Sequence, residues 1–167
     1  GMSALNNFLK KGLRSFGIEV RRRQDFPGPF IYPVTLDNHR IPFWIVDAKA
    51  KKWYCKDLVM TCELAFLKAH CPPGGVVFNV GAHHGLVTLA MARWVGPEGR
   101  VHAFEANSGN AMTLLANIAL NQAWQCAVSH TGVGKEKGNI CIAGERISAP
   151  GQPGAFIPCI SLNDYVA

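Results

Sequence analysis

The sequence has 167 residues, of which 49% are hydrophobic and 17% are charged. This composition is typical of one soluble globular domain, and it excludes the collagen-like, low-complexity and highly charged disordered classes. No window contains the roughly 18 uninterrupted apolar residues that a membrane-spanning helix needs, so we expect no membrane span.

The net charge is +6, and the positive residues gather between Lys10 and Arg23 and again between Lys49 and Lys56. Such clusters can attract phosphates or acidic partners, but they are more often a solvated surface. Aromatic residues do not alternate regularly with the arginines at 21–23, as binding of a single strand by base stacking would require. We therefore expect no nucleic-acid partner.

The six cysteines form no Cys-x-x-Cys pair, and their gaps match no zinc pattern. No apolar signal segment opens the sequence. We therefore expect reduced thiols that pack as small hydrophobic groups, in a cytoplasmic protein.

The first part of the chain is predicted to contain a helix, a hairpin and a second helix. Apolar residues recur at three- and four-residue steps over Ser3–Phe16, which indicates a helix. Strands are expected at Phe30–Leu36 and Arg40–Val46, joined by a turn at Asp37-Asn38-His39. A proline in each strand favours edge positions. The next predicted helix is Asp57–His70.

From residue 76 onward, strands and helices alternate. Strands are predicted at 76–80, 100–105 and 125–130, with helices at 85–95 and 108–121 between them, and further strands near 139–143 and 155–160. This order predicts βαβ units, a parallel sheet and an α/β fold. Strand 76–80 is apolar on both faces apart from Asn79, which is typical of a central strand with helices on both sides.

The turn Gly81-Ala-His-His-Gly85 follows strand 76–80, at the carboxyl end where open α/β sheets bind ligands. Gly81 suits a sharp turn, and Gly85 opens the helix, whose first N–H groups can hold a polar or anionic group. The middle glycine of the dinucleotide fingerprint is replaced by His83, which favours a ligand without a pyrophosphate. Glu105 ends the next strand, 20 residues after Gly85, where an acid can bind ribose hydroxyls.

The two histidines of this turn invite a metal or general-base interpretation. His83 and His84 are adjacent, so their side chains diverge, and no Asp, Glu or Cys lies within six residues of them. We therefore expect no metal site, and we expect the pair to cap the helix and line the pocket.

The segment "VVFNVGAHHGLVTLAMARWVGPEGRVHAFEANSGNAMTLLANIALN", with "GVGKEKGNI" and "SLNDY" further on, resembles the start of an FkbM-type S-adenosylmethionine-dependent methyltransferase domain. The resemblance covers about 76–167 and implies a Rossmann-like methyltransferase sheet that methylates a hydroxyl oxygen of a sugar or other small molecule. By the family's motif, Gly81, His83 and Gly85 would surround the methionine part of the cofactor, and Glu105 would bind the ribose. Ala106, Asn107 and Thr131 would lie near the adenine.

Two features depart from the family pattern. Asn79 stands where the family usually has an aspartate that helps to position the cofactor, so Asn79 is expected at the cofactor pocket or on the backbone of the glycine turn. The strands that follow residue 167 in the family are missing, so the sheet is expected to be incomplete. A further segment or another chain would then pair with strand 76–80, unless 155–160 fills that place. Ser161 and Asp164 match the start of a helix.

These features predict two parts, an N-terminal lead-in at 1–72 and a cofactor-binding part at 73–167. The preferred function is an O-methyltransferase with S-adenosylmethionine as cofactor and a small-molecule acceptor; no catalytic residue is identified. A cofactor-binding module without catalysis is the second interpretation. An NAD-dependent oxidoreductase is the third, and the absent middle glycine counts against it.

Overall fold

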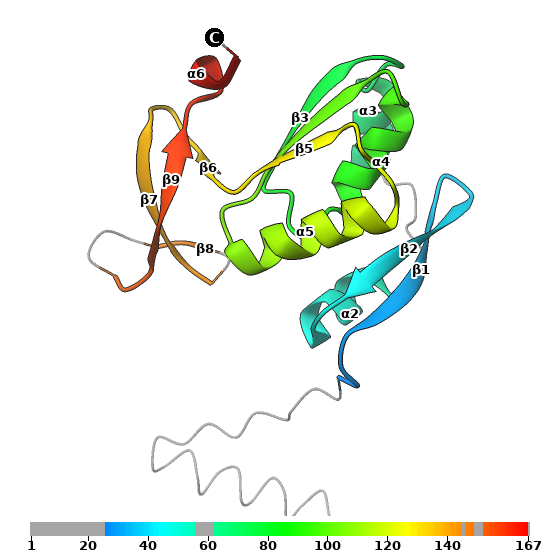
Figure 1. The fold of residues 1–167 in the computed structure, drawn as a ribbon, viewed down its shortest axis with the longest axis horizontal. Coiled ribbons are helices and arrows are strands. Elements are labelled where there is room, and N and C mark those ends of the chain that lie inside the picture. The colour runs from blue at the N-terminus through cyan, green and yellow to red at the C-terminus, as the bar shows by residue number, and fades with distance from the viewer. Residues whose placement is uncertain (1–25, 56–61, 145, 149–151, 167) are drawn as a thin grey trace, which may run out of the picture.

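In the computed structural model, the structure describes residues 26–55, 62–144, 146–148 and 152–166. The helix predicted at Ser3–Phe16 lies outside the described residues. The described part contains three sheets: a hairpin, a parallel three-stranded sheet and a mixed four-stranded sheet (Figure 1). The parallel sheet lies between the other two, and it is the Rossmann-like part of the molecule.

The predicted hairpin is confirmed. β1 (Phe30–Leu36) pairs antiparallel with β2 (His39–Ile45), and Pro33 lies opposite Pro42. The turn has two residues rather than three, because Asp37 and Asn38 both adopt positive φ, 48° and 61°. This left-handed pair matches the right-handed twist of the strands, and Asp and Asn tolerate it. The inner residues of both strands alternate with exposed ones and join the main core: Val34, Leu36, Ile41, Phe43 and Ile45.

Two short helices follow the hairpin. α2 (Ala48–Tyr54) was not predicted; it begins after Asp47, whose Oδ1 accepts the N–H of Ala50 at 2.7 Å. α3 (Cys62–Ala69) corresponds to the second half of the helix predicted at Asp57–His70. The first half of that prediction includes residues 57–61, which lie outside the described residues.

The alternating strands and helices form as predicted. β3 (Val76–Val80), β4 (Arg100–Phe104) and β5 (Cys126–Ser129) are parallel in the order β3-β4-β5. α4 (Leu86–Val95) and α5 (Ser108–Leu120) connect them. Both helices share a core with Val101 and Ala103 on one face of the sheet. The α/β class with a parallel sheet is therefore confirmed.

Among the described residues β3 lies at an edge of the parallel sheet, as expected for an incomplete sheet, although its apolar sequence is typical of a central strand. β3 pairs only with β4 there, and Val76 and Val80 at its ends are 60% and 52% exposed. An apolar strand sequence reports burial of side chains, but not which neighbour will pair with the strand's edge. β9 (Ala155–Ile160) does not fill this place, because it pairs with β6 and β7 in the other sheet.

The mixed sheet has the order β6-β9-β7-β8. β7 (Gly138–Ala143) and β9 match the predicted strands, whereas β6 (Gly132–Val133) and β8 (Arg146–Ile147) are two-residue strands that were not predicted. α6 (Leu162–Val166) confirms the predicted helix start, since Ser161 Oγ accepts the N–H of Asp164 at 3.1 Å.

Tyr165 of α6 covers the second face of the parallel sheet. Its ring meets those of Phe78 and Phe104, and its hydroxyl lies 2.9 Å from Nδ1 of His102. The two faces of the sheet therefore differ, one being packed by two helices and the other by a small aromatic group.

Two contacts fix the hairpin onto the rest of the fold. Asn117 is fully buried in α5; its Oδ1 accepts the N–H of Trp44 at 2.7 Å, and its Nδ2 donates to the carbonyl of His84 at 2.9 Å. At the hairpin turn, Asp37 Oδ2 accepts the indole N–H of Trp94 at 2.6 Å and pairs with Lys68 at 3.0 Å. The hairpin is thereby attached to α3, α4, α5 and the glycine turn. No helix among the described residues is long and apolar enough to cross a membrane.

Candidate functional site

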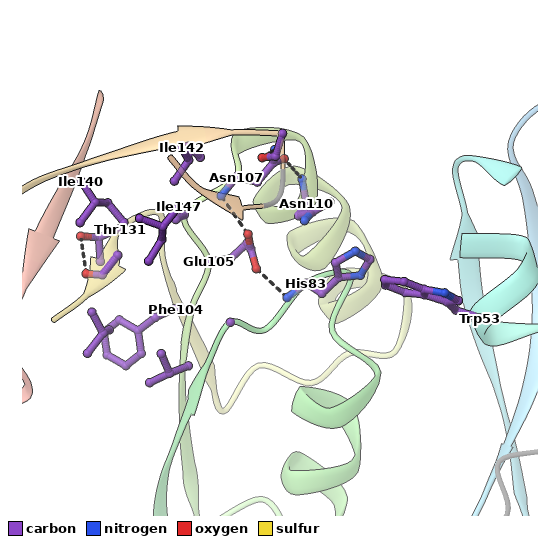
Figure 2. Close-up of a pocket in the computed structure, with 16 residues that line it drawn as sticks. Trp53, His83, Phe104, Glu105, Asn107, Asn110, Thr131, Ile140, Ile142 and Ile147 are labelled. Carbon is purple, nitrogen blue, oxygen red and sulfur yellow. Dashed lines mark hydrogen bonds between the residues drawn. The ribbon is translucent and has the colours of Figure 1, made fainter. Parts of the chain in front are cut away.

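A cavity of about 370 Å³ opens where the carboxyl ends of β3 and β4 face the mixed sheet and α2. Figure 2 shows Glu105 near its middle, Trp53 and His83 on one side, and the isoleucines of the mixed sheet on the other. This is the edge at which parallel α/β sheets place their ligands. Six of the eight predicted site residues line it: Gly81, His83, Glu105, Ala106, Asn107 and Thr131.

The glycine turn is fixed by backbone hydrogen bonds to the end of β4. Gly81 and Ala82 both donate their N–H groups to the carbonyl of Phe104, at 2.9 and 3.0 Å. Gly81 and His83 have φ of 76° and 52°; this left-handed backbone is easy for glycine and unusual for histidine. Gly85 has φ 98° and lies outside the cavity lining. A Cβ there would lie 2.4 Å from Cδ1 of Leu114, so Gly85 lets α4 and α5 approach closely.

Glu105 links the two loops that form the floor of the cavity. It is only 7% exposed; its Oε2 accepts the N–H of His83 at 2.7 Å, and its Oε1 accepts the N–H of Asn107 at 2.8 Å. A carboxylate has about four lone-pair positions, so each oxygen can accept one more hydrogen bond. Two adjacent hydroxyls of a ribose are suitable donors for those positions.

Tyr54 orients the ring of His83. Its hydroxyl lies 2.6 Å from Nδ1 of His83 and also accepts a hydrogen bond from the backbone of His84. Burial, together with the repulsion of a neighbouring charge on His84, lowers the pKa of His83 to about 4. His83 is therefore neutral near pH 7. A neutral imidazole nitrogen and a hydroxyl can each donate or accept, so this contact orients the ring with either nitrogen protonated.

His84 stacks on His83 with ring centroids 4.1 Å apart, and it is 2% exposed. Its Nε2 lies 3.1 Å from Oδ1 of Asn110, and burial lowers its pKa as well. Its Nδ1 has no hydrogen-bond partner among the described residues. The described part of the chain contains no group of three His, Cys, Asp or Glu side chains that could hold a metal ion.

The apolar end of the cavity comes from residues that the sequence did not indicate. Ile140 and Ile142 of β7 and Ile147 of β8 face Phe104 across the cavity (Figure 2). Asn107 fixes the hairpin that carries them, since its Nδ2 donates to the carbonyl of Gly144 at 2.7 Å. This wall depends on how β7 and β8 pair, and no local sequence signal marks it.

Two further predicted residues have structural contacts. Asn79 lies outside the cavity lining, and its Nδ2 donates to Oγ1 of Thr88 on α4 at 2.8 Å. This contact differs from the predicted position at the pocket or on the glycine-turn backbone. It arises because Asn79 shares the sheet face that α4 covers. Thr131 lines the cavity while its Oγ1 donates to the carbonyl of Pro158 at 2.7 Å, which joins β9 to the end of β5.

No family model and no curated protein matches this sequence. Among solved structures, one similar chain is assigned as an rRNA methylase from Clostridium thermocellum. It is 20% identical with a TM-score of 0.39, over 45% of this chain and 43% of that chain. Another is an S-adenosylmethionine-dependent O-methyltransferase from Thermotoga maritima, 14% identical with a TM-score of 0.41, over 60% of this chain and 42% of that chain. The chain therefore spans less than half the length of either structure.

Proposed function

We propose that this chain binds S-adenosylmethionine and acts in a methyltransferase, with a hydroxyl oxygen of a small molecule or sugar as the methyl acceptor. The observation that carries the proposal is Glu105, a carboxylate bound to the glycine turn and placed between an apolar and a polar end of one cavity. An adenosine ligand has the matching order: an aromatic base, a ribose diol and a polar tail.

The chain's own residues would divide the binding. Phe104 and the isoleucines of β7 and β8 would contact the base, and the oxygens of Glu105 would accept the ribose hydroxyls. The tail would then lie toward Gly81, His83 and Trp53. The bound cofactor supplies a methyl group on a sulfonium, and the protein would align it with the acceptor oxygen.

A dinucleotide fits this site less well. The pyrophosphate of NAD is normally bound by backbone N–H groups of the glycine-rich turn. Here the N–H groups of Gly81, Ala82 and His83 are already donated to Phe104 and Glu105. A cofactor-binding module without catalysis would use the same contacts, so only an assay of methyl transfer separates it from an enzyme.

The six cysteines are all free thiols, which supports the proposal that the protein works in the reducing cytoplasm. Pairing of β3 with a strand from another chain or from a further segment also stays a proposal. It is supported by the exposed ends of that strand.

The test of cofactor choice is calorimetric titration of the purified protein with S-adenosylhomocysteine and, separately, with NAD. We expect saturable binding of the first and none of the second. Binding of NAD alone would refute the proposal. Transfer of a radiolabelled methyl group to a pool of hydroxylated metabolites would then support an enzyme over a binding module.

A further inference from the structure

The outer face of the hairpin is apolar as well as the inner one. The buried residues of β1 and β2 point toward the core, so the residues between them point the other way. On that outer face Ile31 lies opposite Trp44, and Pro33 lies opposite Pro42. Ile31 is 57% exposed and Trp44 is 37% exposed, and both prolines are exposed. These two neighbouring pairs form one apolar surface, which we call the hairpin patch.

The hairpin patch has a defined boundary. Antiparallel sheets that face water on one side usually carry polar residues there. Such residues return toward the turn of the hairpin, where Thr35 lies opposite Arg40 on the same outer face. The exposed apolar side chains are therefore confined to the end of the hairpin at which the chain enters β1. An exposed apolar patch with a polar border is typical of a contact surface.

The segment that precedes β1 has matching properties. Residues 1–25 lie outside the described part and join it at Phe26, whose ring centroid is 6.1 Å from that of Phe30 at the start of β1. The sequence of the helix predicted at Ser3–Phe16 places its apolar residues on one face: Leu5, Phe8, Leu9, Leu13 and Phe16. Its positive residues fall on the opposite face, where water would solvate them: Lys10, Lys11 and Arg14.

The connection between this segment and the hairpin suits an intramolecular contact. Residues 17–25 can span at most about 30 Å, and the hairpin patch begins only five residues after Phe26. A short connection gives the segment an effective concentration of about a millimolar, so a modest apolar contact is sufficient. A helix of this length is only marginally stable in water by itself, and packing its apolar face would stabilise it.

α5 has the other exposed apolar helix face near the hairpin, but this face points away from it. Met112 and Leu115 are 67% and 47% exposed. Both lie about 140–160° around the helix axis from Asn117, the residue of α5 that contacts the backbone of β2. The hairpin patch is therefore the nearer surface for a segment that enters at Phe26.

We propose that the segment Ser3–Phe16 docks as an amphipathic helix on the hairpin patch, with its apolar face against Ile31 and Trp44. The hairpin is then a layer between the core and this helix. The inference is independent of the proposed function, because no residue of the hairpin patch lines the cavity.

Limited proteolysis of the full chain with trypsin tests this docking. The segment contains cleavage sites at Lys10, Lys11 and Arg14, and the connection contains sites at Arg21–Arg23. A docked helix is cleaved only in its open fraction, so in the wild type we expect initial cleavage in the segment about tenfold slower than in the connection. The two rates are measured from the masses of the remaining fragments.

Two double variants and one control complete the test. Ile31→Thr with Trp44→Thr makes the hairpin patch polar with a residue that strands accept, and it should bring cleavage in the segment to the rate in the connection. Leu9→Gln with Leu13→Gln should have the same effect from the other side; glutamine keeps helix propensity, and the hairpin is unchanged. Met112→Gln is the control, because it removes an exposed apolar side chain from α5 and should leave the protection intact.

Four other outcomes would overturn the proposal. Equal cleavage of both groups of sites in the wild type, or unchanged protection in both double variants, would show that the segment does not dock on this patch. Loss of protection in Met112→Gln alone would place the segment on α5. Protection that falls when the protein is diluted tenfold would identify a second copy of the chain as the occupant. Protection that needs vesicles of anionic phospholipid would assign the segment to a membrane surface.

Discussion

Glu105 should stabilise the fold of the protein in addition to binding a ligand. Replacement by alanine removes the acceptor for two backbone N–H groups, those of His83 and Asn107. Each unsatisfied buried donor costs about 1–3 kcal/mol, which gives about 2–6 kcal/mol for the pair. Because the cavity is open to water, we expect the lower half of that range. Glu105→Gln keeps one acceptor and turns an NH₂ group toward the other donor, so we expect about 1–3 kcal/mol.

The assay is urea unfolding of wild type, Glu105→Ala and Glu105→Gln, with Glu98→Gln as control. Glu98 is an exposed carboxylate in a turn, and its substitution should change the free energy of unfolding by less than about 0.5 kcal/mol. Hydrogen exchange of the His83 and Asn107 amides should accelerate in both Glu105 variants. Two Glu105 variants as stable as the control, with unchanged exchange at these amides, would refute the reasoning.

Gly85→Ala should lower the free energy of unfolding by about 2–4 kcal/mol, because φ is 98° at this position and the new Cβ would meet a leucine of α5. Gly138→Ala is the control; it has open space around its Cβ position and should be nearly neutral in the same urea titration. The hydrogen bond from the indole N–H lowers the pKa of Asp37 below 3.8, so the stabilisation by its ionised carboxylate should be complete above that pH and lost as the pH falls below it. The free energy of unfolding of Asp37→Asn should therefore decrease less than that of the wild type when unfolding curves are compared from pH 5 to 2.5. Burial lowers the pKa of His83 from 6.5 to about 4. Between these two pH values the imidazole binds a proton in the unfolded chain but not in the folded protein, so the free energy of unfolding should fall as the pH drops through that interval. An NMR titration midpoint of this ring near 6.5 would contradict that expectation. The open edge of β3 should associate with other strands at high protein concentration, and Val76→Lys should reduce the mass measured by light scattering; equal masses for both proteins would argue against such pairing.

The parallel sheet was predictable because its signals are local. The periodicity of α4 and α5, the turns between elements and the glycine turn all lie within short windows of sequence. Glu105 could be identified from its spacing to the glycine turn, since Gly81 and Glu105 directly follow β3 and β4, which are neighbours in the sheet. The hairpin was predictable for the same reason, although its turn proved one residue shorter because both Asp37 and Asn38 accept left-handed backbone.

The remaining features depend on contacts between distant segments. α2 is a seven-residue helix with one buried residue, Ala50, so it lacks the apolar stripe of a longer helix. The N-cap preference of Asp47 is the one signal that could have indicated it. The apolar wall of the cavity arises from the pairing of β7 with β8, which no local signal marks. The open edge of β3, in contrast, was expected from the family resemblance, in which a later strand pairs there.

The amide of Asn117 has a consequence for how this sequence can change over evolutionary time. Its oxygen accepts a hydrogen bond from a backbone N–H of the hairpin, its nitrogen donates one to a backbone carbonyl of the glycine turn, and the side chain is fully buried. Aspartate would place a negative charge against the carbonyl of His84, and leucine would leave both backbone groups without partners. Glutamine is longer by one methylene, which a packed interior does not absorb. Descendants of a common ancestor that keep the hairpin in this position should therefore retain asparagine there, while the surrounding apolar residues exchange freely in size and shape.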